Sequence, residues 1–197
     1  MGTEVLIIAA ILVVAVLYSS VGHAGASGYL AVMALLSVSP ELTRPTALIL
    51  NIFVAMIATV QFYRAGYFDW KVFLSFAATS VPFALLGGMI KLPTNVHKIV
   101  LGAVLLIAAA RLAINFNTDK PLVTPSIWLA LVLGSVMGML SGLTGVGGGI
   151  FLTPVLLLTN WTEPKKAAGV SALFILVNSI AGLIGSYSQI GTLPVTV

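Results

Sequence analysis

Long apolar stretches alternate with short polar segments along the whole chain. A membrane core about 30 Å thick is crossed by roughly 20 residues of apolar helix. This pattern predicts six membrane-spanning helices, over residues 5–21, 45–63, 72–90, 99–114, 127–143 and 167–187. Two further apolar stretches, residues 28–38 and 150–158, are too short to cross the core, so they predict half-helices or re-entrant segments.

The longest polar connection, residues 115–124, divides the chain into two similar halves. Each half has a long helix, a Gly-rich break, a short apolar helix, a Pro-Glu or Glu-Pro turn, and a long helix that begins beside a cation. The shared order of these features predicts an internal duplication. Its first repeat covers residues 1–116 approximately, and an incomplete second repeat covers about 124–197.

The two short segments decide how the repeats are oriented. If both count as crossings, five elements separate the equivalent starting points, and the repeats lie upside down relative to each other. Six of the nine Lys and Arg then lie on one side, which places the amino terminus outside. Re-entrant hairpins would change this parity, so the orientation stays open. We expect an all-α fold: one polytopic transmembrane bundle over residues 1–197, with an inverted internal repeat and two short broken helices.

Composition supports a membrane protein and excludes several functions. The chain is 59% hydrophobic and 7% charged, whereas soluble domains are about a quarter charged. The net charge of +4 comes from basic residues scattered along the chain, so nucleic-acid binding is not expected. Cysteine is absent, and so are HExxH, GxSxG and GxxxxGK[ST] motifs. We therefore expect no enzymatic activity, no cofactor and no metal.

The two Gly-rich breaks are the candidate substrate site. Irregular backbone is tolerated at membrane depth only where protein buries it or where it lines a cavity. The short helix after each break points free N–H groups and the positive end of its dipole at the break, which favours an anion. The candidate substrate-binding residues are Ser20, His23, Gly25 and Ser27 in the first break, and Ser141, Thr144, Gly145, Gly147, Gly148 and Gly149 in the second.

Other glycines have a simpler interpretation, because small residues let membrane helices pack closely. We assign Gly87, Gly88, Gly182 and Gly185 to packing. The same explanation remains open for the two breaks.

Four further polar residues are candidates because of their positions. Arg44 and Lys166 begin the long helices after the breaks, where each would attract an anion or extend to the lipid headgroups. Asn51 and Asn178 lie deeper in the same helices and either tie helices together or face a cavity. His23 is a candidate for ligand contact or proton coupling, although a packed hydrogen-bonding role is the alternative. His97 is assigned to a loop.

The segments GVGGGIFLTPVLLL, which contains Pro154, and EPKKAAGVSALF resemble the TauE/SafE family of sulfite exporters. The block from Gly142 to Ala172 carries the most specific part of this resemblance. The first break departs from it, with Ala31 where the second has Pro154. The resemblance also implies about two further helices, so whether the chain is full length is left open.

The resemblance implies an inner-membrane secondary transporter or exporter of small anions, such as sulfite or related organosulfur anions. A small anionic substrate and the lipid bilayer are the expected partners, and the oligomeric state is left open. Two alternatives stay open as well. TGVGGG at a helix break is also similar to a channel selectivity filter, and a non-transporting scaffold subunit would use the same glycines for assembly.

Overall fold

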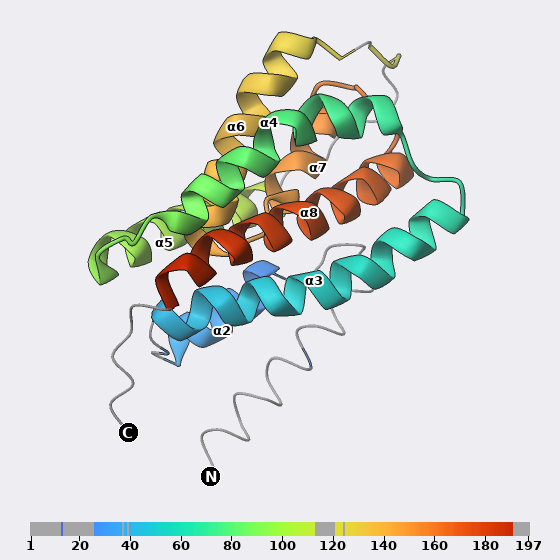
Figure 1. The fold of residues 1–197 in the computed structure, drawn as a ribbon. Helices are drawn as coiled ribbons and strands as arrows, with labels where there is room; N and C mark the ends of the chain where they lie inside the picture. Colours follow the sequence, from blue (N-terminus) through green and yellow to red (C-terminus); the bar gives the residue numbers. More distant parts are fainter. Residues whose placement is uncertain are drawn as a thin grey trace.

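The computed structural model describes residues 13, 26–36, 38, 40–112, 121–123 and 125–190. Within them every regular element is a helix, and the helices with described bounds are α2 (Ala26–Leu35), α3 (Pro40–Arg64), α4 (Trp70–Met89), α5 (Thr94–Leu112), α6 (Ile127–Thr144), α7 (Gly149–Leu158) and α8 (Pro164–Ile190). Figure 1 shows their course. The predicted all-α fold is confirmed. Apart from Val13, the predicted helix over residues 5–21 lies outside the described part of the chain.

Local chemistry explains where the helices begin and end. The Asp69 carboxylate caps α4 by accepting hydrogen bonds from the amides of Lys71 and Val72, at 2.9 and 3.2 Å. Gly145 ends α6 with a φ of 83°, a left-handed conformation that favours glycine. The observed bounds therefore lie within a few residues of the apolar stretches that predicted them.

Among the residues that the structure describes, four helices are long and apolar enough to cross a membrane: Leu42–Arg64 in α3, Trp70–Met89, Ile127–Thr144, and Pro164–Tyr187 in α8. Large apolar side chains cover their outer faces, including those of Phe53, Leu74, Val132 and Ile184. Such surface is unfavourable in water and is expected against lipid. The chain is thus a multi-pass membrane protein. The helix α5, predicted as a span over residues 99–114, covers Thr94–Leu112, and its described apolar part is Thr94–Leu106.

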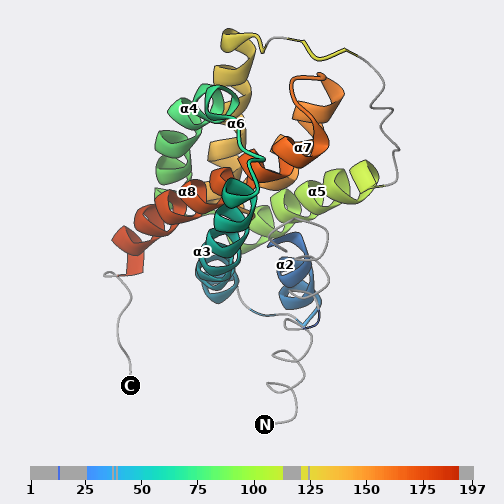
Figure 2. The same ribbon diagram turned by 90° about the vertical axis from the view of Figure 1, so that its right-hand side faces the viewer.

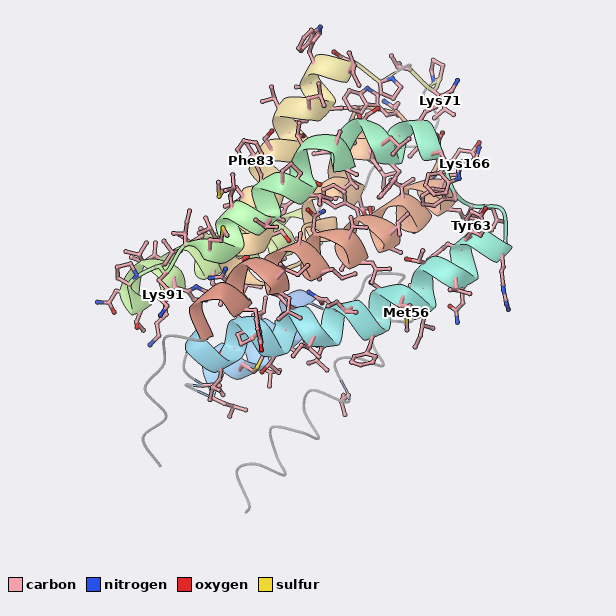
Figure 3. All side chains as sticks on the ribbon, in the orientation of Figure 1. Met56, Tyr63, Lys71, Phe83, Lys91 and Lys166 are labelled. Carbon is pink, nitrogen blue, oxygen red and sulfur yellow. The ribbon has the colours of Figure 1, made fainter. Side chains whose placement is uncertain are left out.

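The long helices pack side by side, with α8 between α3 and α4 (Figure 1) and with α6 against α4. Figure 2 shows α2, α5 and α7 on one side of this group and α4 on the other. Two ends can be distinguished by the lysines labelled in Figure 3. The Lys91 end holds the start of α3, the end of α4 and the start of α5. The Lys71 end holds the end of α3 and the starts of α4 and α8.

Each short helix runs from the interior of the bundle to one of these ends. The helix α7 follows the second break and returns to the end of the bundle where α6 began. There the amide of Val123, just before α6, donates to the carbonyl of Asn160, just after α7, at 2.8 Å. The short helix α2 runs instead from the level of Asn51 to the start of α3, where the Thr43 hydroxyl donates to the Val38 carbonyl. The two short helices therefore lead to opposite ends.

The helices that follow them, α3 and α8, are antiparallel. Gly182 packs against Leu48 near one end, and Gly169 packs against Phe62 near the other. An inverted repeat requires this arrangement. The duplication itself stays a prediction, because residues 14–25 of the first repeat lie outside the described range.

Small residues let the long helices touch backbone to backbone. Gly134, Gly138 and Gly142 are spaced four residues apart on α6 and face α4, and a Cβ built on Gly138 would lie 2.1 Å from the Ser80 carbonyl oxygen. A Cβ on Gly88 would lie 2.5 Å from the Gly182 carbonyl oxygen. The packing role predicted for Gly87, Gly88, Gly182 and Gly185 is confirmed.

We expect Gly138→Ala to destabilise the protein by about 1–3 kcal/mol, because the added methyl group forces the α4 and α6 backbones apart. Gly102→Ala on α5 is the control, since a Cβ there meets no atom within 4 Å. Thermal unfolding in detergent measures both. If Gly138→Ala and Gly102→Ala unfold at the same temperature, the close approach of α4 and α6 is not needed for stability.

Candidate functional site

The second break reverses the chain between α6 and α7 through left-handed glycines. Gly145, Gly147 and Gly148 have φ angles of 83°, 81° and 77°. A Cβ on Gly147 would lie 3.0 Å from Asn51 Nδ2 and 3.1 Å from Ser179 Oγ. Position 147 therefore needs glycine both for its backbone conformation and for space. Because Gly147 has no side chain, α3 and α8 can lie close to the backbone of the break.

Asn51 connects three elements at this point. Its side chain is fully buried, its Nδ2 donates to the Gly145 carbonyl at 3.1 Å, and its Oδ1 accepts from the Tyr29 hydroxyl at 3.1 Å. Asn51 thus ties α3 to α2 and to the break, which is one of its two predicted roles. Asn178 differs, because its Nδ2 donates at 2.8 Å to the Phe174 carbonyl of its own helix.

Three buried polar atoms around the break have no hydrogen-bond partner within the described part of the chain: Ser141 Oγ, Ser179 Oγ and Asn178 Oδ1. Ser141 lies beside Gly148, and Ser179 lies beside Gly147. Thr144 is paired, since its hydroxyl donates to the Leu140 carbonyl at 2.7 Å. Unpaired buried polar groups are uncommon, because burial without a hydrogen bond is costly. These atoms are the strongest ligand-facing candidates.

Backbone N–H groups add to this set. No described acceptor contacts the amides of Gly147 and Gly148. Gly149 begins α7, and first-turn amides of a helix have no acceptor within it. The site therefore combines unpaired hydroxyls with backbone donors and the positive end of a helix dipole.

The two predicted cations lie in different environments. Arg44 is 8% exposed, and its guanidinium donates to the carbonyls of Gly87, Gly88 and Ile90 at the end of α4. It forms no ion pair with any described carboxylate, and its N–H groups are directed at these three carbonyls. Its side chain also passes Gly145, since a Cβ there would lie 3.4 Å from Arg44 Cγ.

Lys166 lies at the Lys71 end, as Figure 3 shows. Its side chain is 39% exposed, and its Nζ lies 3.9 Å from a Glu163 carboxylate oxygen. Asn178 is twelve residues further along α8, or about 18 Å. Of the two cations, only Arg44 is therefore adjacent to the break.

The first break is described only in part. Ser20, His23 and Gly25 lie outside the described residues, and Ser27 is described only as backbone in the first turn of α2. Tyr29 and Leu30, which follow in α2, belong to the same buried cluster as Val146 of the second break. The start of α2 therefore lies close to the second break.

Ser179 was missed by the sequence analysis. The adjacent polar pair Asn178-Ser179 in an apolar helix was the available signal, and only the asparagine was considered.

Comparison with known proteins identifies the family. The family model described as "Sulfite exporter TauE/SafE" matches residues 7–197. The chain belongs to this family. It is 42% identical to "Probable membrane transporter protein y4hK" of Sinorhizobium fredii, over 98% of this chain and 81% of that protein.

Two more distant relatives carry similar names. The chain is 24% identical to "Probable membrane transporter protein YunE" of Bacillus subtilis, over 75% of this chain and 62% of the relative. It is 29% identical to "Probable membrane transporter protein MJ0441" of Methanocaldococcus jannaschii, over 59% of this chain and 45% of that relative. No solved structure matches the chain. The predicted resemblance is confirmed, and the protein is a multi-pass transporter of the cell membrane.

Asn51→Ala should lower the stability of the protein by about 1–3 kcal/mol, because it leaves the buried Gly145 carbonyl without this donor and removes the link to α2. Asn178→Ala is the matched control: it removes an equally buried amide that is bonded only within its own helix. Melting temperatures of the purified protein test the difference. The bridging role of Asn51 is wrong if Asn178→Ala costs as much.

Proposed function

We propose that this protein is a secondary transporter of small anions, sulfite or related organosulfur anions, and that the anion binds at the second break. The observation that supports the proposal best is the pair of buried, unpaired hydroxyls of Ser141 and Ser179 beside Gly147 and Gly148. Each can donate a hydrogen bond to an oxyanion. The amides of the same glycines, which have no acceptor among the described residues, are further donors of the kind that helix starts present to anions.

The charges near the break favour an anion over a cation. Arg44 is buried beside Gly145, and its positive charge is met by carbonyl dipoles without an ion pair to a described carboxylate. Interactions of this charge are strengthened by the apolar surroundings. A bound anion would balance it, whereas a cation would be repelled. The donor set suits an oxyanion because each of its oxygens accepts hydrogen bonds.

The remaining predicted residues complete this proposal. Ser20, His23, Gly25 and Ser27 would face the same anion from the first break, which is supported by the packing of Tyr29 and Leu30 against Val146. Lys166, half-exposed at the Lys71 end, would attract anions to the opposite mouth of the path. Asn178 would contribute its unpaired Oδ1 as an acceptor for a protonated oxyanion.

Ser141→Ala and Ser179→Ala should each raise the KM for sulfite roughly tenfold or more, since a hydrogen bond to a charged group contributes about 1.5–3 kcal/mol. Neither should lower the melting temperature, because neither hydroxyl has a described protein partner. Ser80→Ala is the control, as its hydroxyl is also buried and unpaired, but it lies where α4 packs against Gly138. Sulfite flux into proteoliposomes measures these effects.

The same vesicles separate a carrier from a channel. A carrier exchanges labelled external sulfite faster when unlabelled sulfite is inside, whereas a channel produces single-channel currents and no such stimulation. Flux no greater than in empty vesicles, for several anions and with a pH gradient, would refute anion transport. Wild-type KM values in both serine variants would refute the proposed site.

A further inference from the structure

A cavity lies at the Lys91 end, between the start of α3 and the start of α5. Its volume is about 230 Å³, and its lining residues are Val38, Thr43, His97, Lys98, Leu101, Gly102 and Leu105. Pockets for drug-sized ligands are typically about 300–1,000 Å³, so this cavity suits a small ion or a single headgroup. Water alone would need only about 10–15 Å³. The lining is apolar except for three residues, and two of those carry nitrogen donors.

His97 is the most informative of these residues. It lies in the first turn of α5, which corrects its assignment to a loop, and it is 4% exposed. Its Nε2 has no hydrogen-bond partner among the described residues. Burial and the nearby positive charge of Arg44 lower the pKa of His97, so the neutral ring has one N–H to donate near neutral pH. A buried nitrogen without a partner at a cavity wall indicates a ligand.

The electrostatic surroundings of the cavity are positive. Lys98 lines it, Arg44 is near His97, and the start of α5 contributes the positive end of a helix dipole. The acidic side chains that the structure describes, those of Asp69 and Glu163, belong to the starts of α4 and α8 at the opposite end. Among the described side chains, those that line the cavity therefore favour an anion over a cation, and the chain also places Glu41 in the first turn of α3 at this end.

A buried apolar layer separates this cavity from the second break. Leu101 lines the cavity and packs with Tyr29, Met33, Val104 and Val146 in one buried cluster. Val146 belongs to the break itself. A ligand in the cavity would thus lie on the other side of this layer from Ser141 and Ser179, so the two positions are separate.

We propose that this cavity is a second oxyanion-binding site, in which His97 Nε2 and Lys98 Nζ contact the anion while Leu101 and Leu105 form the apolar part of its wall. Two sources carry this chemistry: a free oxyanion such as sulfite or phosphate, and the phosphate of an anionic lipid at the membrane surface. The proposal does not depend on transport through the second break, because the residues that would contact the anion are different, although Arg44 is near both positions.

The test uses the full chain with ¹⁵N-labelled histidine in phosphatidylcholine nanodiscs, with sulfite and inorganic phosphate as probes. The chain has two histidines, so His97→Gln assigns the His97 imidazole signals. We expect at least one probe to shift the His97 signals saturably. Gly102→Leu should abolish the shift and leave the melting temperature unchanged, since a side chain there enters open space in the cavity wall.

Two lysine variants form a matched pair. Lys98→Gln should raise the apparent Kd roughly two- to fivefold, as expected for the loss of one partly screened charge. Lys91→Gln removes a cation at the same end that does not line the cavity, and it should leave the Kd unchanged. Equal effects of the two variants would indicate a general surface potential and overturn the specific role of Lys98.

Nanodiscs that contain phosphatidylglycerol distinguish the two sources. If the lipid phosphate is the ligand, the His97 signals are shifted before any probe is added, and Gly102→Leu reverses the shift. If a free anion is the ligand, only added sulfite or phosphate produces it. No shift under any of these conditions, or a shift that persists in Gly102→Leu, would overturn the proposal. A Ser141→Ala/Ser179→Ala double variant should keep the His97 shift. Loss of binding at the second break can thus be distinguished from loss of binding in this cavity.

Discussion

The structure depends on supplying hydrogen-bond donors to backbone carbonyls that helix ends leave unpaired inside an apolar bundle. In the described part of the chain, α3 donates to two such groups of carbonyls, one at the end of α4 and one at the end of α6. Arg44 donates to the carbonyls at the end of α4, and Asn51 donates to Gly145 at the end of α6. The two residues are seven positions apart, which puts them on one face of α3, two turns from each other. One face of α3 therefore stabilises the ends of both α4 and α6, whose unpaired carbonyls would otherwise be costly inside the bundle.

Close helix packing makes that arrangement possible. Gly138 and Gly142 bring α6 into backbone contact with α4, and Gly88 does the same between α4 and α8. The carbonyls at the end of α4 thereby come within reach of Arg44, while the break after α6 lies between α3 and α8. Glycine has different functions in these two settings. In the helices it permits close approach, and in the break it permits left-handed backbone that residues with a side chain rarely adopt.

The sequence predicted the helices well and the site only in part, for a physical reason. Helix bounds follow from the length of each apolar stretch and from turn residues such as Asp69 and Gly145, which are local features. The partners of Arg44 are 43 to 46 positions away along the chain, so a cation beside a short helix could not be distinguished from one that reaches the headgroups. The bridge made by Asn51 spans 94 positions. The burial of His97 likewise depends on how α5 packs against the start of α3, which local pattern does not report.

Arg44 connects this structural constraint to the proposed chemistry. The Arg44 guanidinium donates three of its five N–H groups to carbonyls and has no described partner at Nε. The carbonyl dipoles at the end of α4 offset part of its field, but they carry no full negative charge that would neutralise it. Burying such a charge without a counterion is unfavourable, and replacing it by an apolar residue would leave the α4 carbonyls unpaired. The side chain is therefore needed for the fold and at the same time leaves a positive potential next to Gly145. A fold that needs a buried cation to cap one helix thus provides the electrostatic condition for holding an anion at the start of another.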